Sequence, residues 1–115
     1  MRTYQDIEVD IRALVMKSGE MAMMTREDLF NYVASLVAIS DELNNFSRDM
    51  ELQIANAEQS VHMQVAGTKC NASMLSLMIK NKTAPFKADK EWADKQVLLL
   101  RDLRIAALSA KRDGE

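Results

Sequence analysis

The chain has 115 residues, a mass of 13.0 kDa, 48% apolar residues and a formal net charge of −2 at pH 7. With three glycines and one proline, it has too much apolar surface and too few helix breakers for a disordered protein. The single cysteine, Cys70, excludes an internal disulfide, and no apolar run approaches the roughly 20 residues of a membrane-spanning helix. We therefore expect one all-α domain, residues 1–115, in a reducing cytoplasm and without membrane contact.

A short amphipathic helix is predicted within residues 1–19. Thr3 followed by Asp6 is typical of a capping box, in which a hydroxyl and a carboxylate satisfy free backbone amides of the first turn. Gly19 stands where a helix end prefers a residue with positive φ, so the helix should end near Ser18. The apolar residues that recur at helical spacing are Ile7, Ile11, Leu14 and Val15.

The next segment, GEMAMM, is predicted to be a methionine-rich loop. Methionine side chains are flexible and polarisable, so they either fill irregular gaps under helices or bind partners on adaptable surfaces. Both interpretations apply to the nine methionines of the chain. In this loop Met21, Met23 and Met24 are expected to be exposed, which makes them the candidate partner-binding residues.

A long helix is predicted within residues 25–67. Thr25 and Asp28 repeat the capping pattern, and no Pro or Gly follows until residue 67. Ser40 and Ser47 interrupt a strict coiled-coil seam, so packing in a bundle is favoured over a free two-stranded coil. Apolar residues recur every seven positions at Leu29, Leu36, Leu43, Met50 and Ala57, flanked by Tyr32, Val33, Val37, Ile39, Phe46, Ile54, Val61 and Val65.

The remainder of the chain is predicted to be a connector, residues 68–84, and a last helix, residues 85–112. Met74 to Ile79 suit either a short buried helix or a strand, and a helix over 72–80 is favoured because a lone strand has no partner. Pro85 fits the first turn of the last helix, where its missing amide costs nothing. The predicted apolar stripe of that helix is Trp92, Leu99, Leu103, Ala106 and Ala110, widened by Val97, Leu100, Ala107 and Leu108.

Together these elements predict a long antiparallel helical hairpin with a short N-terminal helix. The apolar stripe of the long helix exceeds what so short a chain can cover, so we expect a homo-oligomer that completes a bundle.

The connector and the start of the last helix carry five lysines against one acidic residue, Asp89. Lysines can engage phosphates and a phenylalanine can stack on a base, which makes this segment a candidate nucleic-acid interface. Alternatively the lysines keep a turn soluble and Trp92 belongs to the core. The candidate residues are Lys69, Lys80, Lys82, Phe86, Lys87 and Lys90.

The two halves of the chain have opposite charge. Up to Gly67 there are five basic and eleven acidic residues, a balance of −6, and from Thr68 on there are ten basic and six acidic residues, a balance of +4. Opposite charges favour attraction between the helices of one hairpin or of two subunits. Alternatively, one half offers a charged face to a partner.

Residues for catalysis or metal binding are sparse. His62 and Cys70 have no further His or Cys at ligand spacing, so a solvated or half-buried His62 is favoured over a metal ligand. No arrangement of Ser, His and Asp or of Cys and His suggests a nucleophile, and no Gly-rich loop suggests a phosphate site. We expect no enzyme, no cofactor, no metal and no small-molecule substrate.

A long helix, a turn with lysine and serine, and a last helix containing LLLRDLRIAALSAK resemble small all-helical accessory proteins of phage and prophage early or recombination modules. The resemblance covers residues 29–112 and lies in helix lengths and turn residues, without a diagnostic motif. It implies a non-enzymatic helper of a DNA-processing complex or a host protein, located in the host cytoplasm if phage-encoded, and it assigns no functional residue.

The leading prediction is a non-catalytic protein-interaction module of phage or bacterial type. It would bind a protein partner through the methionine-rich loop and the apolar or acidic face of the long helix. The alternative is a nucleic-acid-binding accessory protein that uses the patch at residues 69–90. A third prediction, an inhibitor that mimics DNA, depends on the acidic half of the chain.

Overall fold

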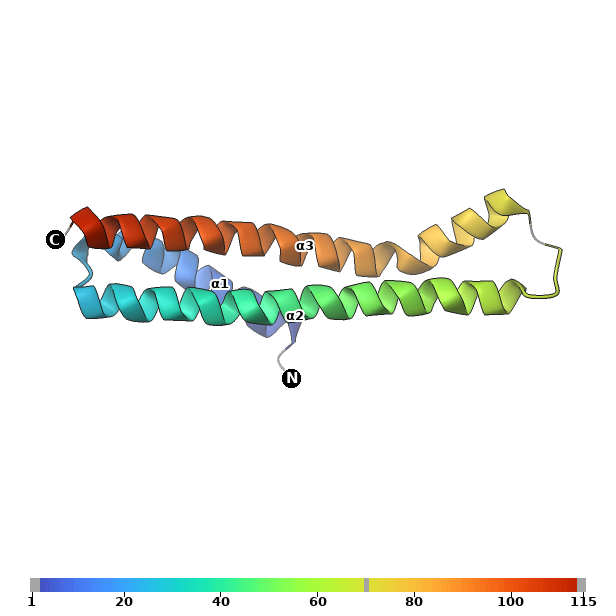
Figure 1. The fold of residues 1–115 in the computed structure, drawn as a ribbon, viewed down its shortest axis with the longest axis horizontal. Coiled ribbons are helices and arrows are strands. Elements are labelled where there is room, and N and C mark those ends of the chain that lie inside the picture. Colours follow the sequence, from blue (N-terminus) through green and yellow to red (C-terminus); the bar gives the residue numbers. More distant parts are fainter. Residues whose placement is uncertain (1–2, 70, 114–115) are drawn as a thin grey trace. The chain divides into compact units, whose positions relative to one another are not determined.

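The computed structural model describes the backbone of residues 3–69 and 71–113, and side chains as far as Ala110. Within these ranges the elements are α1 (Tyr4–Lys17), a 3-10 helix η1 (Ser18–Met23), α2 (Arg26–Val65) and α3 (Ala72–Asp113), and there is no strand. The two long helices α2 and α3 run antiparallel and form a hairpin (Figure 1). The predicted all-α hairpin with a short N-terminal helix is confirmed.

The chain divides into two compact units. Unit 1 comprises residues 1–44 and 94–115, so it contains α1, η1, the first part of α2 and the last part of α3. Unit 2 comprises residues 45–93, with the remaining parts of both long helices and the turn between them.

Helix α1 begins with the predicted capping box. The amide of Asp6 donates to Thr3 Oγ1 at 3.3 Å, and the amide of Thr3 donates to Asp6 Oδ2 at 3.1 Å. The prediction that Gly19 adopts a positive φ is wrong, because Gly67 is the residue with positive φ in the described part of the chain. The chain continues from α1 into η1 without a left-handed residue, since the amide of Ser18 still donates to carbonyls of the last turn.

The segment predicted as a methionine-rich loop is the 3-10 helix η1. Met21 within this helix is buried, with only 8% of the residue exposed. The expectation that Met21 is exposed is therefore wrong. Met23, at 89% exposure, and the half-buried Met24 remain accessible.

Helix α2 follows the sequence prediction closely. The amide of Asp28 donates to Thr25 Oγ1 at 3.1 Å, and the amide of Thr25 donates to Asp28 Oδ2 at 3.4 Å. The helix ends at Val65, and Gly67 supplies a φ of 80° just beyond it. All five residues of the predicted seven-residue repeat are buried: Leu29, Leu36, Leu43, Met50 and Ala57.

In unit 1, apolar contacts and a hydrogen bond from Tyr32 hold α1 against α2. Ile7 and Ile11 are buried on the face of α1 that the spacing predicted. The hydroxyl of Tyr32 donates to the carbonyl of Leu14 at 2.6 Å. Burial raises the pKa of the Tyr32 hydroxyl above its ordinary value of 10.0.

Helix α3 contradicts the predicted connector. It begins at Ala72, where the side chain of Asn71 accepts from the amide of Met74 at 2.7 Å, and it continues past Pro85 to Asp113. The predicted helix start at Pro85 and the end of a short helix at Lys80 are therefore wrong. A proline bends a helix rather than ending it when packing on both sides holds the turns, and α3 bends between its yellow and orange parts (Figure 1).

The buried seam of α3 lies one position from the predicted stripe. Ala93, Leu100 and Ala107 are fully buried, whereas Leu99 is 38% exposed and Ala106 is exposed. The prediction placed Leu100 and Ala107 only at the edge of the stripe, and two of the three inward positions hold alanine. Small residues at a helix interface let two backbones approach, so residue size alone did not identify the seam.

The core of unit 2 combines an aromatic pair with buried hydroxyl groups. Phe46 and Trp92 meet edge to face, with ring centroids 6.3 Å apart and planes at 82°. Ser47 is buried and Thr83 is fully buried; the Thr83 hydroxyl donates to the carbonyl of Ile79 at 2.8 Å. Trp92 therefore contributes to packing, as one of the two predicted interpretations proposed.

Candidate functional site

One side of unit 1 is not covered by α1. Grooves lined by α1 lie along α2 at Ser35 and Ala38 and along α3 at Gln96 and Leu99. A third groove, between α2 and α3, has no lining residue from α1. We call the side of unit 1 with this third groove the open face.

The open face carries large apolar side chains that point away from the core. On α2 two of them are seven residues apart, and on α3 three share one side of the helix at spacings of seven and three. Single exposed apolar residues are ordinary, but a set aligned on two neighbouring helices is typical of an interaction site. Its members are Phe30, Val37, Leu98, Ile105 and Leu108, all exposed.

The groove along the open face has a volume of about 210 Å³ and combines apolar and charged lining residues. Leu36 and Leu100 lie at its base and are buried. Asp41 lines it from α2, and Arg101 and Arg104 line it from α3; all three are exposed. No ion pair within the described residues engages any of these three charges.

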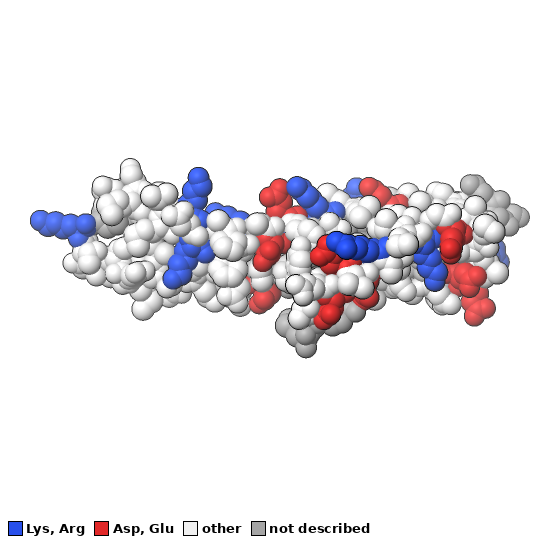
Figure 2. All heavy atoms as spheres, turned by 180° about the vertical axis from the view of Figure 1, so that it is seen from behind, with Lys and Arg blue, Asp and Glu red and all other residues white. Residues whose placement is uncertain are grey.

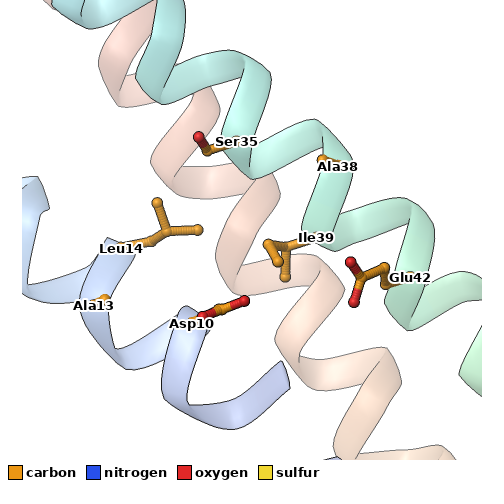
Figure 3. Close-up of a pocket in the computed structure, with 7 residues that line it drawn as sticks. All are labelled: Asp10, Ala13, Leu14, Ser35, Ala38, Ile39 and Glu42. Carbon is orange, nitrogen blue, oxygen red and sulfur yellow. The ribbon is translucent and has the colours of Figure 1, made fainter. Parts of the chain in front are cut away.

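The groove between α1 and α2 is a different kind of site, with a volume of about 410 Å³. Leu14 and Ile39 point toward each other across it, and the carboxylates of Asp10 and Glu42 lie beside Ile39 (Figure 3). Both carboxylates already interact within the chain. The groove is therefore best described as the packing seam of α1.

The groove between α1 and α3, of about 390 Å³, is also a packing seam with an ion pair at its edge. Arg12 and Glu8, both on α1, form a salt bridge of 2.8 Å, and Ile11 lies beside them with its side chain buried. Exposed i, i+4 pairs of this kind stabilise a helix by only a few tenths of a kcal/mol, about 0.3–0.5. The pair solubilises α1 and offers no chemistry.

The turn end of unit 2 is free of acidic residues. From Gln59 to Ala88 the sequence contains no Asp or Glu and four lysines, and we call this segment the basic tip. At the left end of Figure 2 basic side chains are visible without acidic ones. The four lysines are exposed and have no ion pair within the described part of the chain: Lys69, Lys80, Lys82 and Lys87.

Two residues predicted for the nucleic-acid interface are engaged elsewhere. Lys90 Nζ lies 3.5 Å from the Glu51 carboxylate on α2, so its charge is partly neutralised. Phe86 is half-buried, which leaves little of its ring for stacking on a base. Of the six predicted residues, the four lysines of the basic tip are thus the ones with exposed charges that no acidic residue of the described chain pairs.

Residues suited to metal chemistry are not brought together. His62 is exposed on α2, and Cys70 lies outside the described residues. Among the residues that the structure describes, no group of three or more His, Cys, Asp or Glu is arranged to hold a metal ion. Over the same residues, no helix has the length and apolar character to cross a membrane.

The open face was missed at the sequence level, although a signal was present. The prediction treated Val37 and Leu108 as flanks that widen the apolar stripes of their helices. Their spacing from Phe30 and Ile105 instead indicates a second, outward-facing stripe on each helix. Only the position of α1 shows which side of the hairpin stays uncovered.

Comparison with known proteins gives no relative for this chain. No protein-family model matches the sequence, and neither a curated protein nor a solved structure matches it significantly.

Proposed function

We propose that this chain is a non-catalytic protein-interaction module that binds a protein partner on the open face of unit 1. The observation that carries the proposal is the alignment of five exposed apolar side chains on the side of unit 1 that α1 leaves uncovered. The sequence analysis assigned partner binding mainly to the methionine-rich loop. Because Met21 of that loop is buried in the core, we assign the main contact to the open face instead.

The chemistry of the open face suits a helical or otherwise apolar protein surface. Completing the burial of one large apolar side chain stabilises a complex by roughly 1 kcal/mol, and aligned side chains add their contributions. The charges of Asp41, Arg101 and Arg104 can orient a partner along the groove, since complementary charges fix the docking position.

Site-specific photo-cross-linking tests this proposal. A photoreactive amino acid replaces Ile105 on the open face, and a matched variant carries it at Leu52, which is similarly exposed on α2 in unit 2. We expect a discrete covalent adduct from position 105 in cells that express the full chain, and its mass identifies the partner. The change Phe30→Asp in the same chain should remove that adduct.

The control at position 52 distinguishes a specific docking site from non-specific hydrophobic contact. Equal adducts from positions 105 and 52, or an adduct that survives Phe30→Asp with helicity unchanged, would rule out the open face as the docking site. Replacing the exposed Met23 by Ser tests whether the methionine-rich segment makes a secondary contact, since partner capture should then weaken without any loss of stability.

A second candidate function, nucleic-acid binding, is favoured by the basic tip. Four exposed lysines without acidic neighbours in sequence from 59 to 88 create a local positive potential that attracts phosphates. Lysine acts as a point charge and the segment lacks arginine, so we expect binding that is largely independent of base sequence.

Fluorescence anisotropy with labelled single- and double-stranded DNA tests the second candidate. Affinity should fall steeply between about 50 and 200 mM salt, because bound lysines release counterions from the phosphates. The triple change Lys80→Glu, Lys82→Glu and Lys87→Glu should abolish binding. No binding at the lowest salt, or binding that survives the triple change, would exclude the basic tip as the interface.

The third prediction, mimicry of DNA, has less support from the structure. Asp6 and Asp28 cap helices, Glu8 pairs with Arg12, and Glu51 pairs with Lys90. Carboxylates held in caps and pairs do not form the continuous negative surface that imitates a phosphate backbone. A phage or bacterial origin, and residence in the cytoplasm, stay predictions from the sequence.

A further inference from the structure

The charges of the open face are complementary to one another across the groove. Asp41 lies on α2, whereas Arg101 and Arg104 lie on α3, and all three line the same groove in unit 1. They therefore lie at about the same level along the two helices. Such a surface is complementary to a second copy of itself if α2 of each copy faces α3 of the other, because the acid of one copy then lies opposite the bases of the other.

We propose that the partner on the open face is a second copy of this chain, related by a twofold axis parallel to α2 and α3 of unit 1. The inference rests on the proposed function, because it names the occupant of the same docking face. A rotation about this axis places α2 of one copy over α3 of the other and keeps each residue at its level along the helices.

This geometry satisfies the charges of the open face twice. Asp41 of each copy meets Arg101 and Arg104 of the other copy, so two equivalent charge clusters form across the interface. The alternative twofold axis, perpendicular to the helices, places α2 on α2 and α3 on α3. In that arrangement Asp41 of one copy faces Asp41 of the other, and the arginines of α3 face the same arginines. Both contacts bring like charges together and are repulsive.

The packing of an antiparallel bundle is compatible with this axis, while the charges distinguish it from the perpendicular one. With α2 over α3 of the second copy, every helix lies next to an antiparallel neighbour, as in an antiparallel four-helix bundle. The exposed apolar residues of α2, Phe30 and Val37, then face the exposed apolar residues of α3 in the other copy, Leu98, Ile105 and Leu108. α1 stays on the outer side of each copy, where its grooves with α2 and α3 lie.

A charge-exchange experiment on the full chain tests the proposal. One variant carries Asp41→Arg, and the other carries Arg101→Glu together with Arg104→Glu. Because all three side chains are exposed, both variants should keep wild-type helicity by circular dichroism. Each variant alone places like charges at both clusters, so we expect its dimer dissociation constant in sedimentation equilibrium to rise about tenfold or more.

The mixture of the two variants gives the decisive result. In a mixed dimer one cluster pairs the arginine introduced at position 41 of the first variant with the glutamates introduced in the second, and the other cluster keeps the native pairing. Dimerisation in the mixture should therefore return to the wild-type level. If one variant carries a mass tag, the dimer should have the mass of one tagged and one untagged chain. A mixture that stays monomeric, or single variants that dimerise like wild type, would overturn the proposed geometry.

The oligomeric state of the wild-type chain separates this inference from the proposed function. A wild-type monomer at about 100 μM would overturn the second copy as the partner. If position 105 nevertheless forms a specific adduct with another protein, the interaction module stands and only the identity of its partner changes. If position 105 forms no specific adduct at all, both proposals fail.

Discussion

The Tyr32 hydroxyl on α2 donates a hydrogen bond of 2.6 Å to the carbonyl of Leu14 on α1. This bond joins residues 18 positions apart, and it fixes the last turn of α1 against the hairpin within unit 1. The ring of Tyr32 is buried in the same contact. The position of α1 in turn decides which side of unit 1 stays open to a partner.

Replacing Tyr32 by Phe should lower the free energy of unfolding by about 1 kcal/mol, because it removes a part-buried hydrogen bond while keeping the ring. Urea titration followed by circular dichroism measures the change. The matched control is Ser35→Ala, which removes an exposed hydroxyl that bonds only the carbonyl of Asn31 in its own helix. That control should change stability by less than about 0.5 kcal/mol, and an equal effect of both substitutions would contradict the role of the bond.

The raised pKa of Tyr32 predicts a loss of stability at high pH. The folded-state pKa lies above the ordinary value of 10.0, so the unfolded chain releases this proton first as the pH rises. The contribution of the hydroxyl is complete below pH 10 and is lost as the pH rises through the folded-state pKa. Urea titrations at about pH 9 and about pH 11 should show a smaller difference between wild type and Tyr32→Phe at the higher pH; a constant difference would contradict the shift.

Leu100 and Leu99 provide a direct test of the seam of α3. Leu100 is fully buried, whereas Leu99 is 38% exposed. Leu100→Ala should cost about 2–5 kcal/mol of unfolding free energy, the usual range for a buried leucine. Leu99→Ala, the same chemical change one residue away, should cost less than about 1.5 kcal/mol. Equal losses in urea titration would show that the seam passes between the two positions.

The sequence predicted the elements best where local chemistry and spacing agreed. The caps at Thr3 and Thr25 and the repeat through Leu43 each depend on residues within one or two turns, and the structure confirms them. Predictions were wrong where distant packing decides the outcome. Pro85 breaks an isolated helix but is accommodated inside α3, and Met21 in η1 is drawn into the core of unit 1.

The candidate site was less accessible from the sequence than the fold. Exposed Phe30 and Ile105 occupy helix positions that an amphipathic pattern assigns to the edge of a core. The contact between Tyr32 and Leu14, on the side of the hairpin that receives α1, joins residues 18 positions apart, and no local pattern encodes it. The basic tip, in contrast, follows from composition alone, since the absence of acidic residues from 59 to 88 is readable directly.

The two glycines that come soon after the ends of α1 and α2 should respond in opposite ways to alanine. Gly67 has a φ of 80°, whereas Gly19 does not adopt a positive φ, and a Cβ at either position meets no atom within 4 Å. Gly67→Ala should lose roughly 1 kcal/mol through backbone strain, and Gly19→Ala should gain about 0.4–1 kcal/mol by restricting the unfolded chain. Thermal unfolding of both variants measures the difference, and a stabilising Gly67→Ala would show that the turn after α2 relaxes to another conformation.

Pro85 inside α3 should cost stability that alanine restores. The proline removes the amide that would bond the carbonyl of Asn81, and its ring crowds that carbonyl, at a cost of up to about 3 kcal/mol in a helix interior. Pro85→Ala should therefore raise the free energy of unfolding by about 1–3 kcal/mol, and Pro85→Gly should raise it by about 1 kcal/mol less, because glycine is the weaker helix former. Urea titration measures both changes. If Pro85→Ala instead destabilises the chain, the packing of the fully buried Thr83 requires the bend, and the proline then shapes the core of unit 2.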